Sequence, residues 1–114
     1  MYLYGDMKKS LKTQSRPAVL EAINERADLL SHVLKALGHP LRLRIVALLC
    51  EGDEHVNGMA ERLGAPQAMV SQQLGVLRMN RLVESRREHG FAYYSIAEPR
   101  LHDLVSCLQG CQRV

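Results

Sequence analysis

The hydrophobic period of the chain changes at Leu82, and this change limits the folds that the chain can adopt. Up to that point apolar side chains recur at helical spacing, whereas "LVESRRE" and "FAYYSIA" are strand-like runs rich in Val, Tyr, Phe and Ile. The dipeptide "HG" joins the two runs, which predicts a hairpin with Gly90 in its turn. A two-stranded hairpin is not stable alone, so it must pack against the helices.

The rest of the sequence predicts five helices. Four precede the hairpin: over residues 18–37, from Pro40 to just before Gly52, over residues 56–63, and within "APQAMVSQQLGVLRMNRL". A last helix follows in "EPRLHDLVSCLQGC", with Pro99 in its first turn. The predicted fold is therefore mainly α with a small β-hairpin, in the order α-α-α-α-β-β-α.

Length and composition favour one small domain. The chain has 114 residues, of which 46% are hydrophobic, enough for a modest core. Residues 1–17 predict a flexible N-terminal tail without the apolar stretch of a secretion signal, and residues 18–114 form the predicted domain. No apolar run is long enough to cross a membrane, so we expect no membrane partner.

Charge and cysteine content indicate where such a protein works. The net charge of +3 and the pI near 8.9 permit binding to nucleic acid without establishing it. Three cysteines are an odd number, and they lack the spacing of a zinc ribbon. This pattern favours a cytoplasmic protein whose thiols are reduced.

A tight turn joins two of the predicted helices, which is the pattern of a helix-turn-helix. These helices are "VNGMAERLG" and "PQAMVSQQLGVLRM". In the second helix Val70, Leu74 and Leu77 form an apolar stripe that the core can hold. The opposite face carries small and amide side chains, which suit contacts with base edges in the major groove. The alternative is the ordinary solvated face of an amphipathic helix. The predicted base-reading residues are Gln67, Ala68, Ser71 and Gln72.

Basic side chains cluster at the tip of the predicted hairpin, at Arg86, Arg87 and His89. A basic hairpin after a reading helix forms a wing, which can lie along the phosphates or in the minor groove. Arginine suits that task because its planar guanidinium is permanently charged. An ordinary solvated turn is the alternative, but the order of helix pair and basic hairpin favours the wing.

Three stretches resemble the ArsR/SmtB family of bacterial winged-helix repressors. They are "LKALGHPLRLRIVALL", "PQAMVSQQLGVLRMNRLVESRREH" and "AYYSI", and the resemblance extends from about Leu34 to Ile96. The chain departs from the family at Gln73, where His is usual, and at Pro66, where Ser is frequent. We place Gln73 and Arg78 with the predicted DNA contacts.

The resemblance implies a winged helix-turn-helix repressor that binds an inverted-repeat operator as a homodimer. It also implies that the first and last helices form the dimer interface. Two-fold symmetry would place the two recognition helices about 34 Å apart, one turn of DNA. The expected partners are therefore double-stranded operator DNA and a second copy of the chain.

Members of this family are released from DNA by a metal, arsenite, an oxidant or a sulfur species. The family's metal site with two Cys in the third helix is absent from "VNGMAERLG". A second family site would fall near Glu98, Arg100, Cys111 and Val114, and neither Arg100 nor Val114 can be a ligand.

The candidate sensor residues are therefore the thiols of Cys50, Cys107 and Cys111. Cys107 and Cys111 are four residues apart, so we expect them on one side of the last helix. Oxidation or reactive sulfur is one possible signal. The same thiols could bind arsenite or a soft metal ion, and Cys can also be a plain core residue. No cofactor is required.

Two other classes of protein fit the sequence less well. An enzyme is not expected, because no catalytic motif, phosphate loop, nucleotide fingerprint or Cys-x-x-Cys pair occurs. A dimeric interaction module without DNA binding predicts an acidic or apolar wing, whereas this one carries Arg86 and Arg87. The sequence thus favours a DNA-binding transcriptional regulator.

Overall fold

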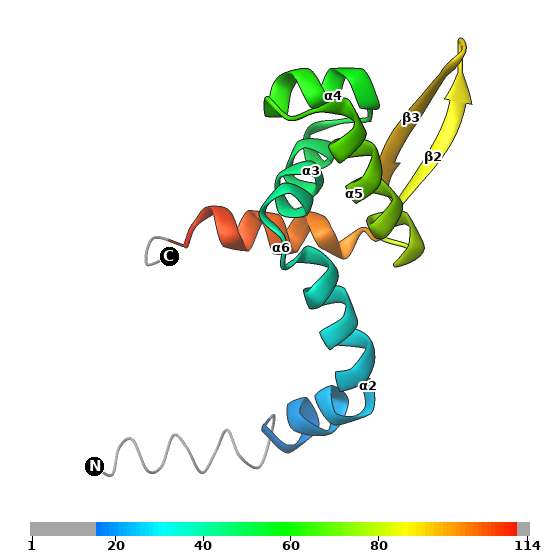
Figure 1. Cartoon of the computed structure of the whole chain (residues 1–114). Coiled ribbons are helices and arrows are strands. Elements are labelled where there is room, and N and C mark those ends of the chain that lie inside the picture. Colours follow the sequence, from blue (N-terminus) through cyan, green and yellow to red (C-terminus); the bar gives the residue numbers. More distant parts are fainter. Residues whose placement is uncertain (1–15, 112–114) are drawn as a thin grey trace. The chain divides into compact units, whose positions relative to one another are not determined.

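The computed structural model describes residues 16–111 and divides into two compact units, one up to His32 and one from Val33 onward (Figure 1). Helix α2 (Arg16–Leu37) crosses that boundary and begins two residues before the predicted position. Most of the predicted tail, residues 1–15, lies outside the described residues. In the first unit the side chains of residues 18–29 are all exposed.

The second unit confirms the predicted mainly α winged helix-turn-helix and adds one strand. The addition is β1 (Glu54–His55), which pairs with β3 and makes a three-stranded antiparallel sheet of order β1-β3-β2. Two residues are too few to show an alternating pattern, so the sequence did not predict this strand. The other elements are α3 (Pro40–Glu51), α4 (Val56–Leu63), α5 (Gln67–Met79), β2 (Val83–Glu88), β3 (Phe91–Ile96) and α6 (Arg100–Gln109).

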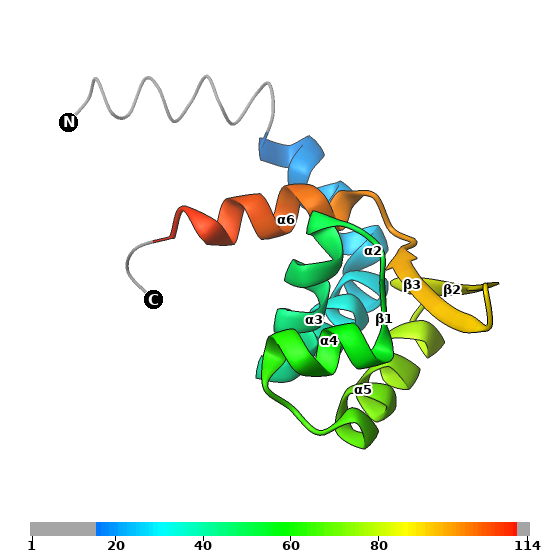
Figure 2. The same ribbon diagram turned by 90° about the horizontal axis from the view of Figure 1, so that it is seen from above.

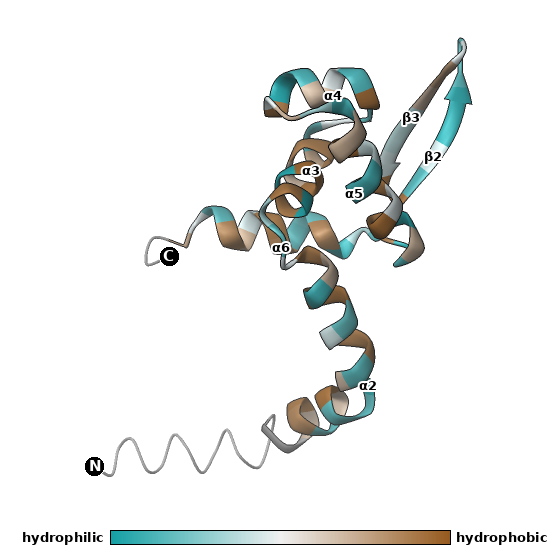
Figure 3. Cartoon of the chain, viewed as in Figure 1, coloured by the Kyte–Doolittle hydropathy of each residue, from teal (hydrophilic) through white to brown (hydrophobic). Residues whose placement is uncertain are grey.

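Helix α3 supplies the largest share of the core of the second unit. It is apolar along most of its length (Figure 3), and Ile45 and Val46 are completely buried. It packs against α5, α6 and β3. The predicted stripe of α5 is confirmed, since its three side chains have no exposed surface; they are Val70, Leu74 and Leu77. Burying a side chain of this size contributes about 1.5–3 kcal/mol, which fixes α5 with its other face outward.

The turn between α4 and α5 depends on Gly64. This residue has φ 62° and ψ 34°, a left-handed conformation in which a residue with a Cβ is strained. Pro66 precedes the first turn of α5 in the N-cap position, with φ −61° and no side-chain cap. The short connection holds the two helices together as a helix-turn-helix.

The hairpin has the predicted two-residue turn. His89 and Gly90 have φ 53° and 84°, and Glu88 pairs with Phe91 across the turn. Positive φ at both positions matches the twist of the strands. The views in Figures 1 and 2 place this hairpin beside α5, against which β2 packs.

No helix within residues 16–111 has the length and apolar character that crossing a bilayer demands.

Candidate nucleic-acid interface

The outer face of α5 is exposed over its N-terminal half. Its polar and small side chains are held outward because the opposite stripe is buried in the core. The predicted base-reading residues therefore lie together on one accessible surface, and DNA contact by them stays a prediction. This surface consists of Gln67, Ala68, Ser71 and Gln72.

Met69 adds an apolar side chain to this helix that the sequence reading missed. It is 48% exposed, although the large apolar residues of the neighbouring stripe are buried. The sequence did contain a signal for this exposure, because Met69 lies one residue before Val70 and therefore outside the buried stripe. An exposed methionine beside Ala68 gives the helix an apolar surface of the kind that contacts a thymine methyl group.

Gln73 lies half-buried and contacts another helix. Its Oε1 accepts a hydrogen bond of 2.7 Å from Nη1 of Arg42 on α3. The same guanidinium donates to the backbone carbonyls of Lys35 and Ala36 at the end of α2. Gln73 thus supplies the acceptor that connects α5 to α3 through Arg42. Its predicted contact with DNA stays a prediction.

Arg86 of the wing is engaged by two carboxylates. Its Nη1 lies 2.7 Å from Asp53 Oδ2, its Nε lies 3.1 Å from Glu88 Oε2, and its guanidinium stands 5.5 Å from the centre of the Tyr93 ring. The hydrogen bond to Asp53 and then that to Glu88 raise the pKa of Arg86 above its usual value. Because Asp53 immediately precedes β1, Arg86 reaches from β2 across β3 to the far edge of the sheet.

The other basic residues predicted to contact DNA differ in position. Arg87 is exposed, pairs in register with Ala92, and donates from Nη1 to the Gly90 carbonyl at 3.3 Å. His89 is exposed in the turn itself. Arg78 is exposed in the last turn of α5, at the opposite end of that helix from Gln67. Arg87 and His89 therefore form the accessible basic tip of the wing.

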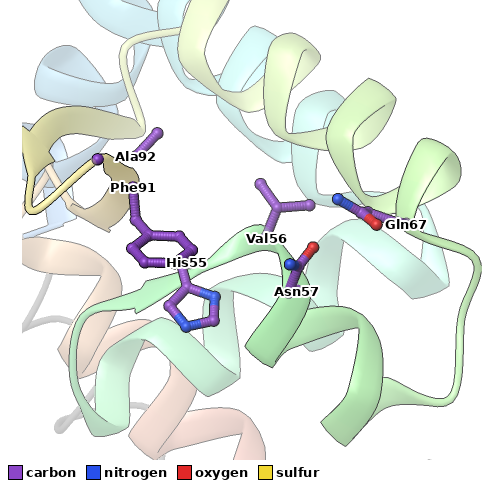
Figure 4. A pocket seen from close by; sticks show the side chains of 7 residues that line it. His55, Val56, Asn57, Gln67, Phe91 and Ala92 are labelled. Atoms are coloured by element: carbon purple, nitrogen blue, oxygen red, sulfur yellow. The ribbon is translucent and has the colours of Figure 1, made fainter.

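A pocket of about 180 Å³ lies where the start of α4, the start of α5 and the wing tip meet (Figure 4). The His55 ring stacks on Phe91, with centroids 5.2 Å apart and an angle of 25° between the planes. Three segments distant in sequence meet here, so periodicity alone could not find the site. Its lining residues are His55, Val56, Asn57, Gln67, Gly90, Phe91 and Ala92.

The three cysteines differ in environment. Cys50 is half-buried in the last turn of α3, and this burial raises the pKa of its thiol. Cys107 and Cys111 are exposed free thiols. The expectation that these two share one side of the last helix is wrong, because α6 ends at Gln109 with Gly110 as its C-cap. Glycine is a poor helix former, which favours termination there.

Within the described part of the chain, no three His, Cys, Asp or Glu side chains gather in a group that could hold a metal ion. Binding of arsenite or a soft metal by Cys50, Cys107 and Cys111 stays a prediction. Their role as sensor thiols stays a prediction.

Comparison with known proteins gives consistent similarities. The model of the family described as "Bacterial regulatory protein, arsR family" matches residues 39–85, which include α3, α4 and α5. The biofilm growth-associated repressor of Xylella fastidiosa is 36% identical over 103 residues, covering 90% of this chain and 90% of that protein.

Two solved structures extend the similarity to the fold. The crystal structure of the transcriptional repressor BigR from Xylella fastidiosa has a TM-score of 0.75 and 37% identity, covering 82% of this chain and 97% of that chain. A homodimeric winged helix-turn-helix DNA-binding domain from Mycobacterium bovis, described as a possible ArsR-family regulator, has a TM-score of 0.67 and 33% identity. That match covers 84% of this chain and 83% of that chain.

Proposed function

The chain belongs to the ArsR family of bacterial regulatory proteins, and from this premise we propose that it represses transcription by binding an inverted-repeat operator as a homodimer. It is a DNA-binding transcriptional regulator and not an enzyme. The observation that best supports the proposal is the position of the exposed face of α5. It lies opposite a completely buried stripe, so the core holds this face outward, where DNA can reach it. Repression is supported by the relatives that are named repressors.

The two DNA-contacting elements have different roles in this proposal. The amide of Gln72 on α5 suits adenine edges, Ser71 suits several bases or a phosphate, and the amide of Gln67 in the first turn suits a phosphate. Arg87 and His89 at the wing tip lie along the sugar-phosphate backbone, which fixes the register of α5 without reading sequence. An operator-binding protein of this kind works in the bacterial cytoplasm, where its DNA lies.

The homodimer is supported by apolar side chains that stay exposed. Val19, Leu20, Ile23 and Leu29 of α2 are between 47% and 60% exposed, and Leu108 of α6 is 44% exposed. Apolar side chains clustered on a surface mark sites of association. The Mycobacterium bovis domain is described as homodimeric. In the proposal α2 and α6 of two copies cover these side chains across a two-fold axis.

Fluorescence anisotropy with labelled DNA tests the operator proposal. The DNA should be the promoter region upstream of the protein's own gene, with unrelated DNA of equal length as competitor. We expect salt-sensitive, sequence-selective binding of two chains per inverted repeat. Gln72→Ala should change the preference among operator variants, whereas Gln109→Ala, an exposed glutamine on α6, should not. Binding that ignores sequence would contradict the proposal.

In this proposal the thiols of Cys50, Cys107 and Cys111 sense the signal that releases the protein from its operator. Support comes from their free thiols, two of which are exposed. With diamide, two thiols lose two protons and two electrons and form one disulfide, while diamide is reduced to the hydrazine. Intact mass spectrometry and operator binding should be measured together after diamide, polysulfide, arsenite or cadmium. A protein that stays unmodified and DNA-competent in every case would contradict a sensor role.

A further inference from the structure

The pocket between α4, α5 and the wing tip lies between the two elements assigned to DNA in the proposed function. We infer that one sugar-phosphate segment of the operator binds in this pocket and that uncharged groups hold it there. The groups are the side-chain amides of Asn57 and Gln67 and the ring of Phe91. This inference rests on the proposed DNA binding and adds Asn57 and Phe91 to the DNA contacts that the sequence motifs predict.

The position of the pocket follows from the path of DNA past the protein. A recognition helix occupies a major groove, and a wing lies along the neighbouring backbone or minor groove. One backbone strand separates those two grooves, so it must pass between α5 and the wing. The pocket has Gln67 of α5 on one side and Gly90, Phe91 and Ala92 of the wing on another. The separating strand therefore passes over this pocket.

The chemistry of the lining suits a phosphate bound by hydrogen bonds rather than by a cation. Asn57 and Gln67 are exposed, and neither side chain makes a hydrogen bond with another residue of the described chain. Each amide has two N–H donors available for phosphate oxygens. No Lys or Arg lines the pocket. In the view of Figure 4 these two amides lie toward one end of the pocket and the His55 and Phe91 rings toward the other.

Phe91 provides an oriented apolar surface beside those donors. Its side chain is 49% exposed, yet the stacked His55 ring holds it from one side. His55 is itself fixed, because its Nδ1 accepts from the Gly58 amide at 3.0 Å and its ring makes a T-shaped contact with the Tyr93 ring, with centroids 5.4 Å apart. A fixed phenyl ring next to a phosphate site suits the apolar face of a deoxyribose.

The size of the pocket favours this occupant over a small-molecule effector. Its volume of about 180 Å³ is below the roughly 300–1,000 Å³ of pockets that enclose drug-sized ligands. The site is also open to solvent and has exposed residues on three sides, including Asn57, Gln67 and Phe91. A segment of a longer polymer can use such a shallow site, because the rest of the polymer is held by α5 and the wing.

The dependence of binding on salt distinguishes an amide contact from a cationic one. Asn57→Ala and Gln67→Ala should each weaken binding to operator and to unrelated DNA by a similar factor, roughly tenfold. The slope of log K against log salt should not change, since a neutral amide releases no counterion. Arg87→Ala should instead lower the slope by about 0.9. Asn57→Asp should weaken binding further, because it places a carboxylate beside the phosphate.

Single methylphosphonate substitutions in the operator locate the contact. At one phosphate in each half-site the substitution should weaken binding of the unaltered protein and have little further effect on Asn57→Ala. Gln109→Ala is the matched control, and circular dichroism confirms that each variant is folded. Unchanged binding by both Asn57→Ala and Gln67→Ala would overturn this inference alone, and so would a loss confined to one DNA sequence. Absence of operator binding by the unaltered protein would overturn the proposed function as well.

Discussion

His55 connects the start of α4 to the sheet, because its ring makes contacts in both directions. Nδ1 caps α4 through the Gly58 amide, and the ring stacks on Phe91. Loss of an N-cap acceptor costs about 1 kcal/mol. We expect His55→Ala to lower the free energy of unfolding by about that amount, and His55→Asn to restore it, since asparagine is also a good N-cap. Urea unfolding measures both.

The two substitutions at His55 also separate stability from DNA binding. Asparagine cannot stack on Phe91 as the imidazole does, so His55→Asn should remain weaker than the unaltered protein in binding DNA of any sequence. His39→Ala is the matched control, because His39 Nδ1 caps α3 in the same way through the Leu41 amide. Equal stability of His55→Ala and His55→Asn would show that the cap contributes little.

We expect Cys50 to react more slowly with alkylating agents than the other two thiols. Burial raises its pKa, so at a given pH a smaller fraction of this thiol is the reactive thiolate. We expect N-ethylmaleimide to modify Cys107 and Cys111 first at neutral pH, because both are exposed. As pH rises, the labelling rate of Cys50 should level off at a higher pH than the labelling rate of a free cysteine in solution. Peptide mass spectrometry against time measures this order, and faster labelling of Cys50 would contradict it.

At the scale of elements, Arg86 connects β2 of the wing with Asp53, which precedes β1 at the far edge of the sheet. Since Asp53 and Glu88 already occupy its guanidinium, we expect Arg86 to orient the wing and Arg87 to contact phosphate. Arg87→Ala should lower the salt slope of DNA binding by about 0.9. Arg86→Ala and Asp53→Asn should weaken binding with a smaller change in slope. Anisotropy titrations over several salt concentrations measure these slopes.

Two comparisons sharpen this prediction for the wing. Arg62→Ala removes an exposed pair of similar geometry, with Nη1 3.0 Å from Glu51 Oε1, between α4 and α3. It controls for the general effect of losing an arginine. If Asp53→Asn tightened DNA binding while Arg86→Ala lowered the slope as much as Arg87→Ala, Arg86 would be a direct phosphate contact.

Elements with a local pattern were predictable from the sequence, and contacts between distant segments were not. The spacing of Val70, Leu74 and Leu77 is a property of one helix, so it indicated both the helix and its buried face. The Arg86–Asp53 pair joins residues 33 positions apart, and β1 exists only because β3 returns beside it. Neither has a signal in the local sequence, and the same holds for the pocket around Asn57.

At the scale of the whole molecule, the balance of buried and exposed apolar surface favours association. A chain of 114 residues buries a limited share of its surface. Helix α2 adds Val19, Leu20 and Ile23 to the exposed surface. Burial of these side chains against a partner would contribute favourable free energy, which is absent while they stay in water. A second copy is the partner that the proposed function supplies, and it also brings two copies of α5 to one operator.

Ile23→Glu tests this interface, because it places a charge among apolar side chains that the dimer would bury. We expect sedimentation equilibrium to show a shift from dimer to monomer, and operator affinity to fall because one chain then binds only one half-site. His32→Glu is the matched control, since it introduces the same charge at an exposed position on the other side of α2 from Ile23. Leu108→Glu tests α6 in the same way. If both Ile23→Glu and Leu108→Glu stayed dimeric with unchanged operator affinity, the two chains would associate through another surface.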